Sequence, residues 1–220
     1  MKINKRIKSH ILSKTVDKDH RMIGIEVECF VYTKNHKRLP VNPSNGYSAF
    51  DLLNDLNNKS KKKNGSYSLE PGGQIEWASP PCADIRVLEK ALFSYKKSMD
   101  SVLNKKDLLS LYIGVDPFYD PDSIDLIDQK KYQLMNLNMG KKGTLGKWMM
   151  RNTSSIQVNY DIINENDAEE IMFISDCIHP ISSYLFSNSP FQLGKPVGEN
   201  NLRNHIWENT DTTRCRTLFD

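Results

Sequence analysis

Long apolar runs are missing from this sequence of 220 residues, and what it lacks excludes several classes of protein. No stretch of about 18 apolar residues occurs, so we expect no membrane-spanning helix. The four cysteines, Cys29, Cys82, Cys177 and Cys215, show no C-x-x-C spacing, which disfavours zinc ribbons and thioredoxin-type sites. The basic N-terminus lacks the apolar core of a secretory signal, so we expect a cytoplasmic protein with reduced thiols.

The composition is that of a globular chain, with 38% hydrophobic and 26% charged residues. At about 150 residues per domain, the length predicts roughly one domain. Residues 1–38 carry ten Lys or Arg against four Asp or Glu, whereas the other 182 residues carry 20 and 23. A basic arm can bind nucleic acid or membrane, but no aromatic residues interleave with these basic residues as a stacking platform. We therefore favour a solvated basic leading segment over residues 1–20, with neither partner.

The spacing of apolar residues along the sequence predicts the main strands and helices. Alternation with period two predicts a strand at residues 22–33, with Glu26 and Glu28 on one face and Val27 and Cys29 on the other. Further strands are expected at 66–70, 73–79, 108–115 and 153–161, and helices at 83–106, 128–139 and 166–187. A short helix is expected within 47–56 and an exposed loop at 59–63. Because these elements do not alternate strictly as β-α-β, we predict an α+β fold with an antiparallel sheet.

Glu26 and Glu28 are the clearest local indication of chemistry. A strand presents residues i and i+2 on one face, about 7 Å apart. Two carboxylates placed there repel each other and are costly to bury, so a cation is expected beside them. Mg²⁺ prefers carboxylate oxygens and commonly bridges them to substrate phosphates. The alternative is a strand with one solvated face, on which two glutamates are ordinary.

Two other segments repeat the pattern. Gln74 and Glu76 share a strand face, and Glu70 precedes a turn whose two glycines allow a positive φ or the close approach of a ligand. Gln157 and Asn159 are again spaced i, i+2. Each of these pairs could also be the solvent-facing polar residues of an ordinary hairpin. Three strands with paired polar groups nevertheless predict a polar-lined cavity over one face of a sheet.

Other candidate motifs are weaker. Residues 141–147 fail the phosphate-loop pattern because Gly140 and Gly146 are six apart and Trp148 stands where Ser or Thr is needed. Arg203 could bind a carboxylate or phosphate in bidentate fashion, although a lone arginine is usually a surface residue. His205 is expected to be structural. No Ser/His/Asp or Cys/His arrangement indicates a nucleophile.

Four blocks resemble the plant and proteobacterial type of glutamate–cysteine ligase. They are IGIEVE at 23–28, SLEPGGQIEWAS at 68–79, KYQLMNLNMGKKGTLGKWMMRNTSSIQVNYD at 131–161 and LFSNSPFQLGKPVGENNLRNHIWENTDTTRC at 185–215. Their order and length make the resemblance specific, and it covers nearly everything from residue 21 onward.

The resemblance implies a glutamine-synthetase-like fold, a curved antiparallel sheet with flanking helices and the active site on its concave face. It implies ATP- and Mg²⁺-dependent ligation of the γ-carboxylate of L-glutamate to the amine of L-cysteine through an acyl phosphate, the first step of glutathione synthesis. It also implies residue roles: metal ligands at Glu26, Glu28 and Glu76 with Glu70 as a weaker candidate, nucleotide and metal contacts at Gln157 and Asn159, and a substrate or phosphate contact at Arg203.

The sequence departs from the family pattern at two points. Trp77 stands where a smaller or aliphatic residue is expected, a minor change if its ring covers the site. Family enzymes run considerably further, so we expect residues 21–220 to be the N-terminal portion of a catalytic domain and its sheet to be incomplete. Two alternatives stay open: a carboxylate–amine ligase with another amine acceptor, and a truncated or split subunit that binds nucleotide or a second chain supplying the C-terminal half.

Overall fold

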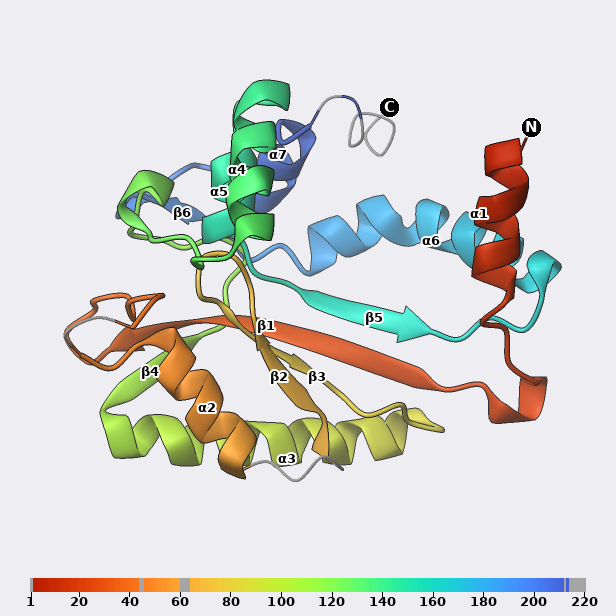
Figure 1. Ribbon diagram of the computed structural model, residues 1–220, viewed down its shortest axis with the longest axis horizontal. Helices are drawn as coiled ribbons and strands as arrows, with labels where there is room; N and C mark the ends of the chain where they lie inside the picture. Colours follow the sequence, from red (N-terminus) through yellow and green to blue (C-terminus); the bar gives the residue numbers. More distant parts are fainter. Residues whose placement is uncertain (1, 44–45, 60–63, 212, 214–220) are drawn as a thin grey trace.

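The computed structural model describes residues 2–43, 46–59, 64–211 and 213 (Figure 1). Its main elements, in chain order, are α1 (Lys2–Leu12), β1 (Ile23–Thr33), α2 (Ala49–Lys59), β2 (Ser66–Leu69), β3 (Ile75–Ala78), α3 (Ile85–Leu103), β4 (Leu108–Leu111), α4 (Lys130–Lys142), α5 (Gly146–Asn152), β5 (Ile156–Tyr160), α6 (Glu165–Leu185), β6 (Phe191–Gln192), β7 (Lys195–Pro196) and α7 (Leu202–Glu208). Single turns of 3-10 helix lie at 18–20, 104–106 and 121–123.

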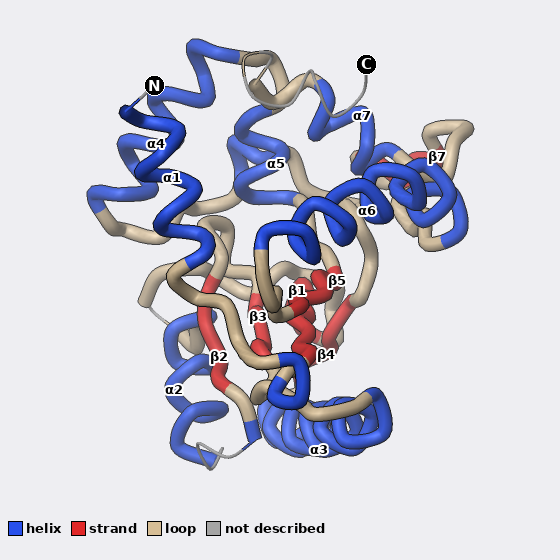
Figure 2. Tube along the Cα trace, turned by 90° about the vertical axis from the view of Figure 1, so that its right-hand side faces the viewer, coloured by secondary structure: helices blue, strands red, loops and turns tan. Residues whose placement is uncertain are grey.

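Strand β1 is the centre of one antiparallel sheet. Along one edge it pairs with β3, which in turn pairs with β2. Along the other edge it pairs first with β5 and then, further along its length, with β4. Figures 1 and 2 show the sheet between two layers, with α2 and α3 on one side and the other helices on the opposite side. The predicted α+β class with an antiparallel sheet is therefore confirmed.

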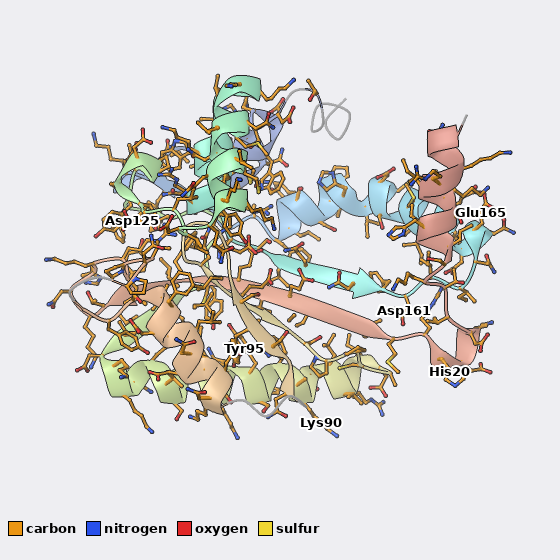
Figure 3. All side chains as sticks on the ribbon, viewed as in Figure 1. His20, Lys90, Tyr95, Asp125, Asp161 and Glu165 are labelled. Atoms are coloured by element: carbon orange, nitrogen blue, oxygen red, sulfur yellow. The ribbon has the colours of Figure 1, made fainter. Side chains whose placement is uncertain are left out.

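The core lies between the sheet and the layer formed by α2 and α3. Val27, Cys29 and Val31 of β1 are buried there, as the period-two alternation predicted. Trp77 of β3 lies on the same face, fully buried, and its ring stacks on that of Tyr95 with 4.5 Å between centroids. The indole therefore does not cover the polar face, contrary to the role considered for it. Figure 3 shows Tyr95 on α3 beneath the sheet.

Most element predictions agree with the structure, with differences at the ends. Asn164 is the N-cap of helix α6. Its side chain accepts a hydrogen bond from the Asp167 N–H at 3.0 Å. The strand expected at 108–115 ends at residue 111. Three short helices, α1, α5 and α7, were not predicted, and residues 141–147 comprise the end of α4, a short connection and the start of α5. Of the loop predicted at 59–63, residue 59 ends α2 and the remainder lies outside the described residues.

Three cysteines are free thiols: Cys29 and Cys82 are buried and Cys177 is exposed. Cys215 lies outside the described residues. Across the described ranges, no helix combines the length and the apolar character needed to cross a membrane.

A buried ion pair joins three segments above one end of the sheet. Arg38 Nη1 lies 2.7 Å from Asp116 Oδ2, and the side chains are 5% and 0% exposed. Arg38 Nη2 also donates to the carbonyl oxygens of Gly72, at 2.9 Å, and Arg151, at 2.7 Å. The Tyr32 hydroxyl donates to the same Asp116 oxygen at 2.7 Å. Because the partners come from the β1 end, the β2–β3 turn and α5, this pair fixes those segments relative to one another.

We predict that Asp116→Asn destabilises the protein by about 3–5 kcal/mol, because it leaves the Arg38 cation buried without its counter-charge. The matched control is Asp107→Asn, which removes the partner of Lys34 from an exposed ion pair and should cost under about 1 kcal/mol. Asp107 has φ 54°, a conformation that asparagine tolerates. Chemical denaturation of both variants measures the difference, and equal losses would contradict the role given to the buried pair.

Candidate active site

The sheet face opposite the core carries an acidic patch, which we define as Glu26, Glu28, Glu70 and Glu76. Alternation along β1 turns Glu26 and Glu28 away from the buried Val27 and Cys29. The antiparallel register places Glu76 of β3 directly opposite Glu28. Cross-strand neighbours on one face lie about 5 Å apart at Cβ, so like charges there repel.

Strand β5 supplies the neutral side of the same face. Its register places Gln157 opposite Glu26 and Asn159 opposite Gly24. The Gln157 amide donates to Glu28 Oε1 at 3.0 Å, and the Asn159 amide donates to Glu26 Oε1 at 3.1 Å. Each of the two β1 carboxylates is therefore held by an amide from the neighbouring strand.

Two serines complete the hydrogen bonding of the patch. The Ser155 N–H donates to Glu28 Oε2 at 2.9 Å, and the Ser68 hydroxyl of β2 donates to Glu76 Oε1 at 2.7 Å. Neither serine was singled out as a functional residue from the sequence. The signal for Ser68 was its i, i+2 spacing to Glu70, whereas Ser155 acts through its main chain, which residue type does not reveal.

Glu70 joins the patch through the turn between β2 and β3. The Glu70 N–H donates to the Gln74 carbonyl at 2.9 Å and the Gly73 N–H to the Glu70 carbonyl at 2.8 Å. Gly73 has φ 78°, which explains the glycine. Gln74 itself is buried and donates to the Thr153 carbonyl at 2.8 Å. It therefore connects the turn to the start of β5 and does not line the open face.

Burial and neighbouring carboxylates shift the protonation of Glu28 and Glu70. Burial and then the neighbouring Glu70 carboxylate raise the pKa of Glu28 to about 7, although the Arg203 guanidinium opposes the shift. Burial and then the Glu76 carboxylate also raise the pKa of Glu70, against Lys131. Both carboxyl groups are therefore protonated more readily than an exposed glutamate.

Arg203 of α7 is the cation that lowers the pKa of Glu28. Burial lowers the pKa of its guanidinium, and the Glu28 carboxylate counteracts this. The guanidinium lies 5.5 Å from the centroid of the Trp207 ring, and its buried Nε has no hydrogen-bond partner. Among the described residues it forms no ion pair within 4 Å. Arg203 can therefore accept an anionic group from a ligand.

The structure brings together seven of the residues singled out from the sequence, whereas Gln74, also expected on the polar face, is buried away from it. Five lie on adjacent strands, and Glu70 and Arg203 act on Glu28 from a turn and a helix. The 141–147 stretch does not join them, because Lys147 binds Asp122 at 2.6 Å. Lys131, which was not singled out, affects Glu70 from α4.

The patch suits a hard divalent cation in donor chemistry, since it offers several carboxylates in excess of local positive charge. Within the described part of the chain, no three Asp, Glu, His or Cys side chains converge closely enough to enclose a metal ion. Mg²⁺ does not require such an enclosure, because it is usually held by one or two carboxylates together with substrate phosphates and water. Glu26, Glu28 and Glu76, with Glu70, are the residues that would hold it.

A cavity of about 220 Å³ opens at one end of the acidic patch, beside Glu26 and Asn159. Its lining includes Gly24 and Ala78 together with larger residues such as Met22 and Tyr160, and Asp161 also contributes. Figure 3 shows Asp161 just beyond the end of β5.

Comparison with known proteins gives one consistent family. Residues 22–220 match the family described as glutamate-cysteine ligase family 2 (GCS2). The chloroplastic glutamate–cysteine ligase A of Oryza sativa subsp. indica is 31% identical over 224 residues, which cover 96% of this chain and 45% of the relative. The chloroplastic enzyme of Arabidopsis thaliana is also 31% identical, with 96% and 42% covered. The chain thus spans less than half the length of these relatives.

Among solved structures, the glutamate–cysteine ligase of Francisella tularensis in complex with AMP is similar, with a TM-score of 0.45 and 18% identity. The similarity covers 75% of this chain and 31% of that one.

We predict that Glu28→Gln stabilises the protein at pH 8. The raised pKa means that the folded state disfavours the ionised carboxylate. Wild-type stability therefore falls as the pH rises from 4.5, the ordinary value, to about 7. The variant should gain about 1–3 kcal/mol at pH 8 and nothing below pH about 4.

Urea denaturation at both pH values measures the gain, with the exposed Glu199→Gln as a control that should change stability at neither pH. A Glu28 variant that is equally or less stable than wild type at pH 8 would show that the patch is not electrostatically strained.

Proposed function

The chain belongs to glutamate-cysteine ligase family 2, and from that premise we propose that its acidic patch binds Mg²⁺ and ATP during ligation of L-glutamate to L-cysteine. The observation that carries the proposal is that one sheet face places three carboxylates and two amides on adjacent strands, with Glu70 and Arg203 close enough to shift the pKa of Glu28. The seven side chains come from β1, β3, β5, a turn and α7, so it is a tertiary arrangement rather than a local one.

The reaction has two group transfers. An oxygen of the glutamate γ-carboxylate attacks the γ-phosphorus of ATP, and ADP leaves. The cysteine amine then attacks the acyl carbon of γ-glutamyl phosphate, inorganic phosphate leaves, and the nitrogen loses a proton. Both steps gather negative charge on phosphate oxygens, so catalysis depends chiefly on positioning and charge neutralisation.

The residues of this chain have matching roles in the proposal. Bound Mg²⁺ would supply Lewis-acid charge to the phosphates. Glu26, Glu28 and Glu76 would hold it, and the amides of Gln157 and Asn159 fix the orientation of the β1 carboxylates. Arg203 would bind a substrate carboxylate or a phosphate, since its buried Nε has no hydrogen-bond partner among the described residues.

Two other candidates use the same patch. One is a ligase that joins glutamate to a different amine, and the cavity beside Glu26 is where an acceptor of another size would be accommodated. The other is a subunit that binds nucleotide without turnover and requires a second chain. We also propose a reducing compartment such as the cytoplasm, from the cysteine spacing in the sequence; the plant relatives carry chloroplastic names.

We predict that Glu26→Gln and Glu76→Gln each reduce the rise in melting temperature produced by Mg²⁺–ATP to less than about half of the wild-type rise, because stabilisation by a ligand follows its affinity. Both variants should fold, since removing one of several repelling carboxylates relieves repulsion. Thermal melts with and without Mg²⁺–ATP measure this, with Glu199→Gln as the control. Variants that keep the full rise would refute the metal assignment.

An assay of ADP release separates the three candidates. We expect release that needs L-glutamate and L-cysteine together. Equal release with another primary amine in place of cysteine would favour the broader ligase. Mg²⁺–ATP binding without release in any combination would favour the binding subunit.

A further inference from the structure

The carboxylates on the strands of the acidic patch differ in how many hydrogen bonds fix them. Both oxygens of Glu28 accept one, Oε1 at 3.0 Å and Oε2 at 2.9 Å. Glu76 accepts through Oε1 alone, from the Ser68 hydroxyl at 2.7 Å, and no other described residue donates to its carboxylate. The orientation of the Glu76 carboxylate therefore depends on a single hydrogen bond, whereas two fix that of Glu28.

The sheet register places Glu76 between two neighbours of opposite kind. Strand β2 sets Ser68 directly opposite Glu76 on one side, and β1 sets Glu28 directly opposite it on the other. Figure 2 shows β3 between these two strands. Ser68 donates a hydrogen bond, whereas Glu28 carries like charge when it is ionised. Without the Ser68 hydroxyl, that repulsion would act on a carboxylate that no hydrogen bond fixes.

Strand β2 carries two serines on the polar face of the sheet, and only one of them lies opposite a carboxylate. Tyr67 and Leu69 are buried in the core, so alternation turns Ser66 and Ser68 to the other face, where both are exposed. Ser66 is paired with Ala78, which offers no polar side chain. The two serines therefore share strand, face and exposure and differ in the residue opposite.

We propose that Ser68 is a positioning residue of the metal site: its hydroxyl holds Oε1 of Glu76 and leaves Oε2 free for a divalent cation. The proposal rests on the proposed function, because Ser68 acts only through a carboxylate that the proposed function takes as a metal ligand. A hydrogen bond to a ligating carboxylate fixes the oxygen that binds the metal, and losing such a partner typically weakens metal binding by about 10- to 100-fold.

The test measures metal binding by the 220-residue chain without turnover. Mn²⁺ prefers the same oxygen ligands as Mg²⁺, and the electron paramagnetic resonance signal of free Mn²⁺ gives its dissociation constant. Ser68→Ala should raise this constant about tenfold, and the matched control Ser66→Ala should leave it within about twofold of wild type. Without metal, both variants should melt within about 2 °C of wild type, since each removes one exposed hydroxyl.

A second pair of variants separates the hydroxyl from the shape of the side chain. Threonine and valine have nearly the same shape and both favour strands, but only threonine donates a hydrogen bond. Ser68→Thr should bind Mn²⁺ within about twofold of wild type, and Ser68→Val about tenfold more weakly. Ser68→Ala combined with Glu76→Gln should bind no more weakly than Glu76→Gln alone, because the serine acts through that carboxylate.

The role of Ser68 is refuted if Ser68→Ala binds Mn²⁺ as wild type does, if Ser68→Thr binds as weakly as Ser68→Val, or if Ser68→Ala weakens binding further in the Glu76→Gln background. If Ser68→Ala does not fold, the threonine and valine variants decide. Wild type tests the proposed function separately: if it binds neither Mn²⁺ nor Mg²⁺–ATP, both proposals fail. If wild type binds and Glu76→Gln weakens binding while Ser68→Ala does not, only the role of Ser68 fails.

Discussion

The buried Arg38–Asp116 pair is the interaction on which the remainder of the structure depends. A single guanidinium binds Asp116 and the carbonyls of Gly72 and Arg151, and it lies 4.7 Å from the centroid of the Phe30 ring. A Cβ at Gly72 would lie 2.5 Å from the Arg151 carbonyl oxygen, so only glycine permits this approach. An arginine buried so deeply is stable only if its donors are satisfied, which restricts how the β2–β3 turn and α5 can be placed.

That restriction decides the geometry of the acidic patch. Glu70 precedes the turn held by Arg38, and Ser155 follows the helix held by it. Gln74 adds a second connection between the same two segments through the Thr153 carbonyl. Ionised Glu28 is unfavourable in the patch, because burial first and then the neighbouring Glu70 carboxylate raise its pKa. The arrangement of the patch is maintained by the core on one side of the sheet and by the Arg38 network at its end, and a cationic ligand would relieve the repulsion.

The two faces of the sheet consequently have opposite energetic roles. The face towards α2 and α3 buries apolar side chains and stabilises the fold. The other face contains charged groups whose burial is unfavourable without a partner. Strand β5 takes part in only one of these roles, because it presents Gln157 and Asn159 to the patch while its apolar residues remain exposed. This asymmetry explains why the site and the exposed apolar residues occur on the same strand.

The sequence by itself determined the local features. Alternation over residues 22–33 predicted β1 and both of its faces, and the i, i+2 spacings identified Glu26 and Glu28 on β1 and Gln157 and Asn159 on β5. These predictions succeed because the period of a strand depends on neighbouring residues. Only the tertiary structure decided that Glu76 lies opposite Glu28, that Arg203 acts on Glu28 from 175 positions later in the chain, and that Arg38 connects three segments. Register, burial and charge coupling depend on residues distant in sequence, and no local pattern encodes them.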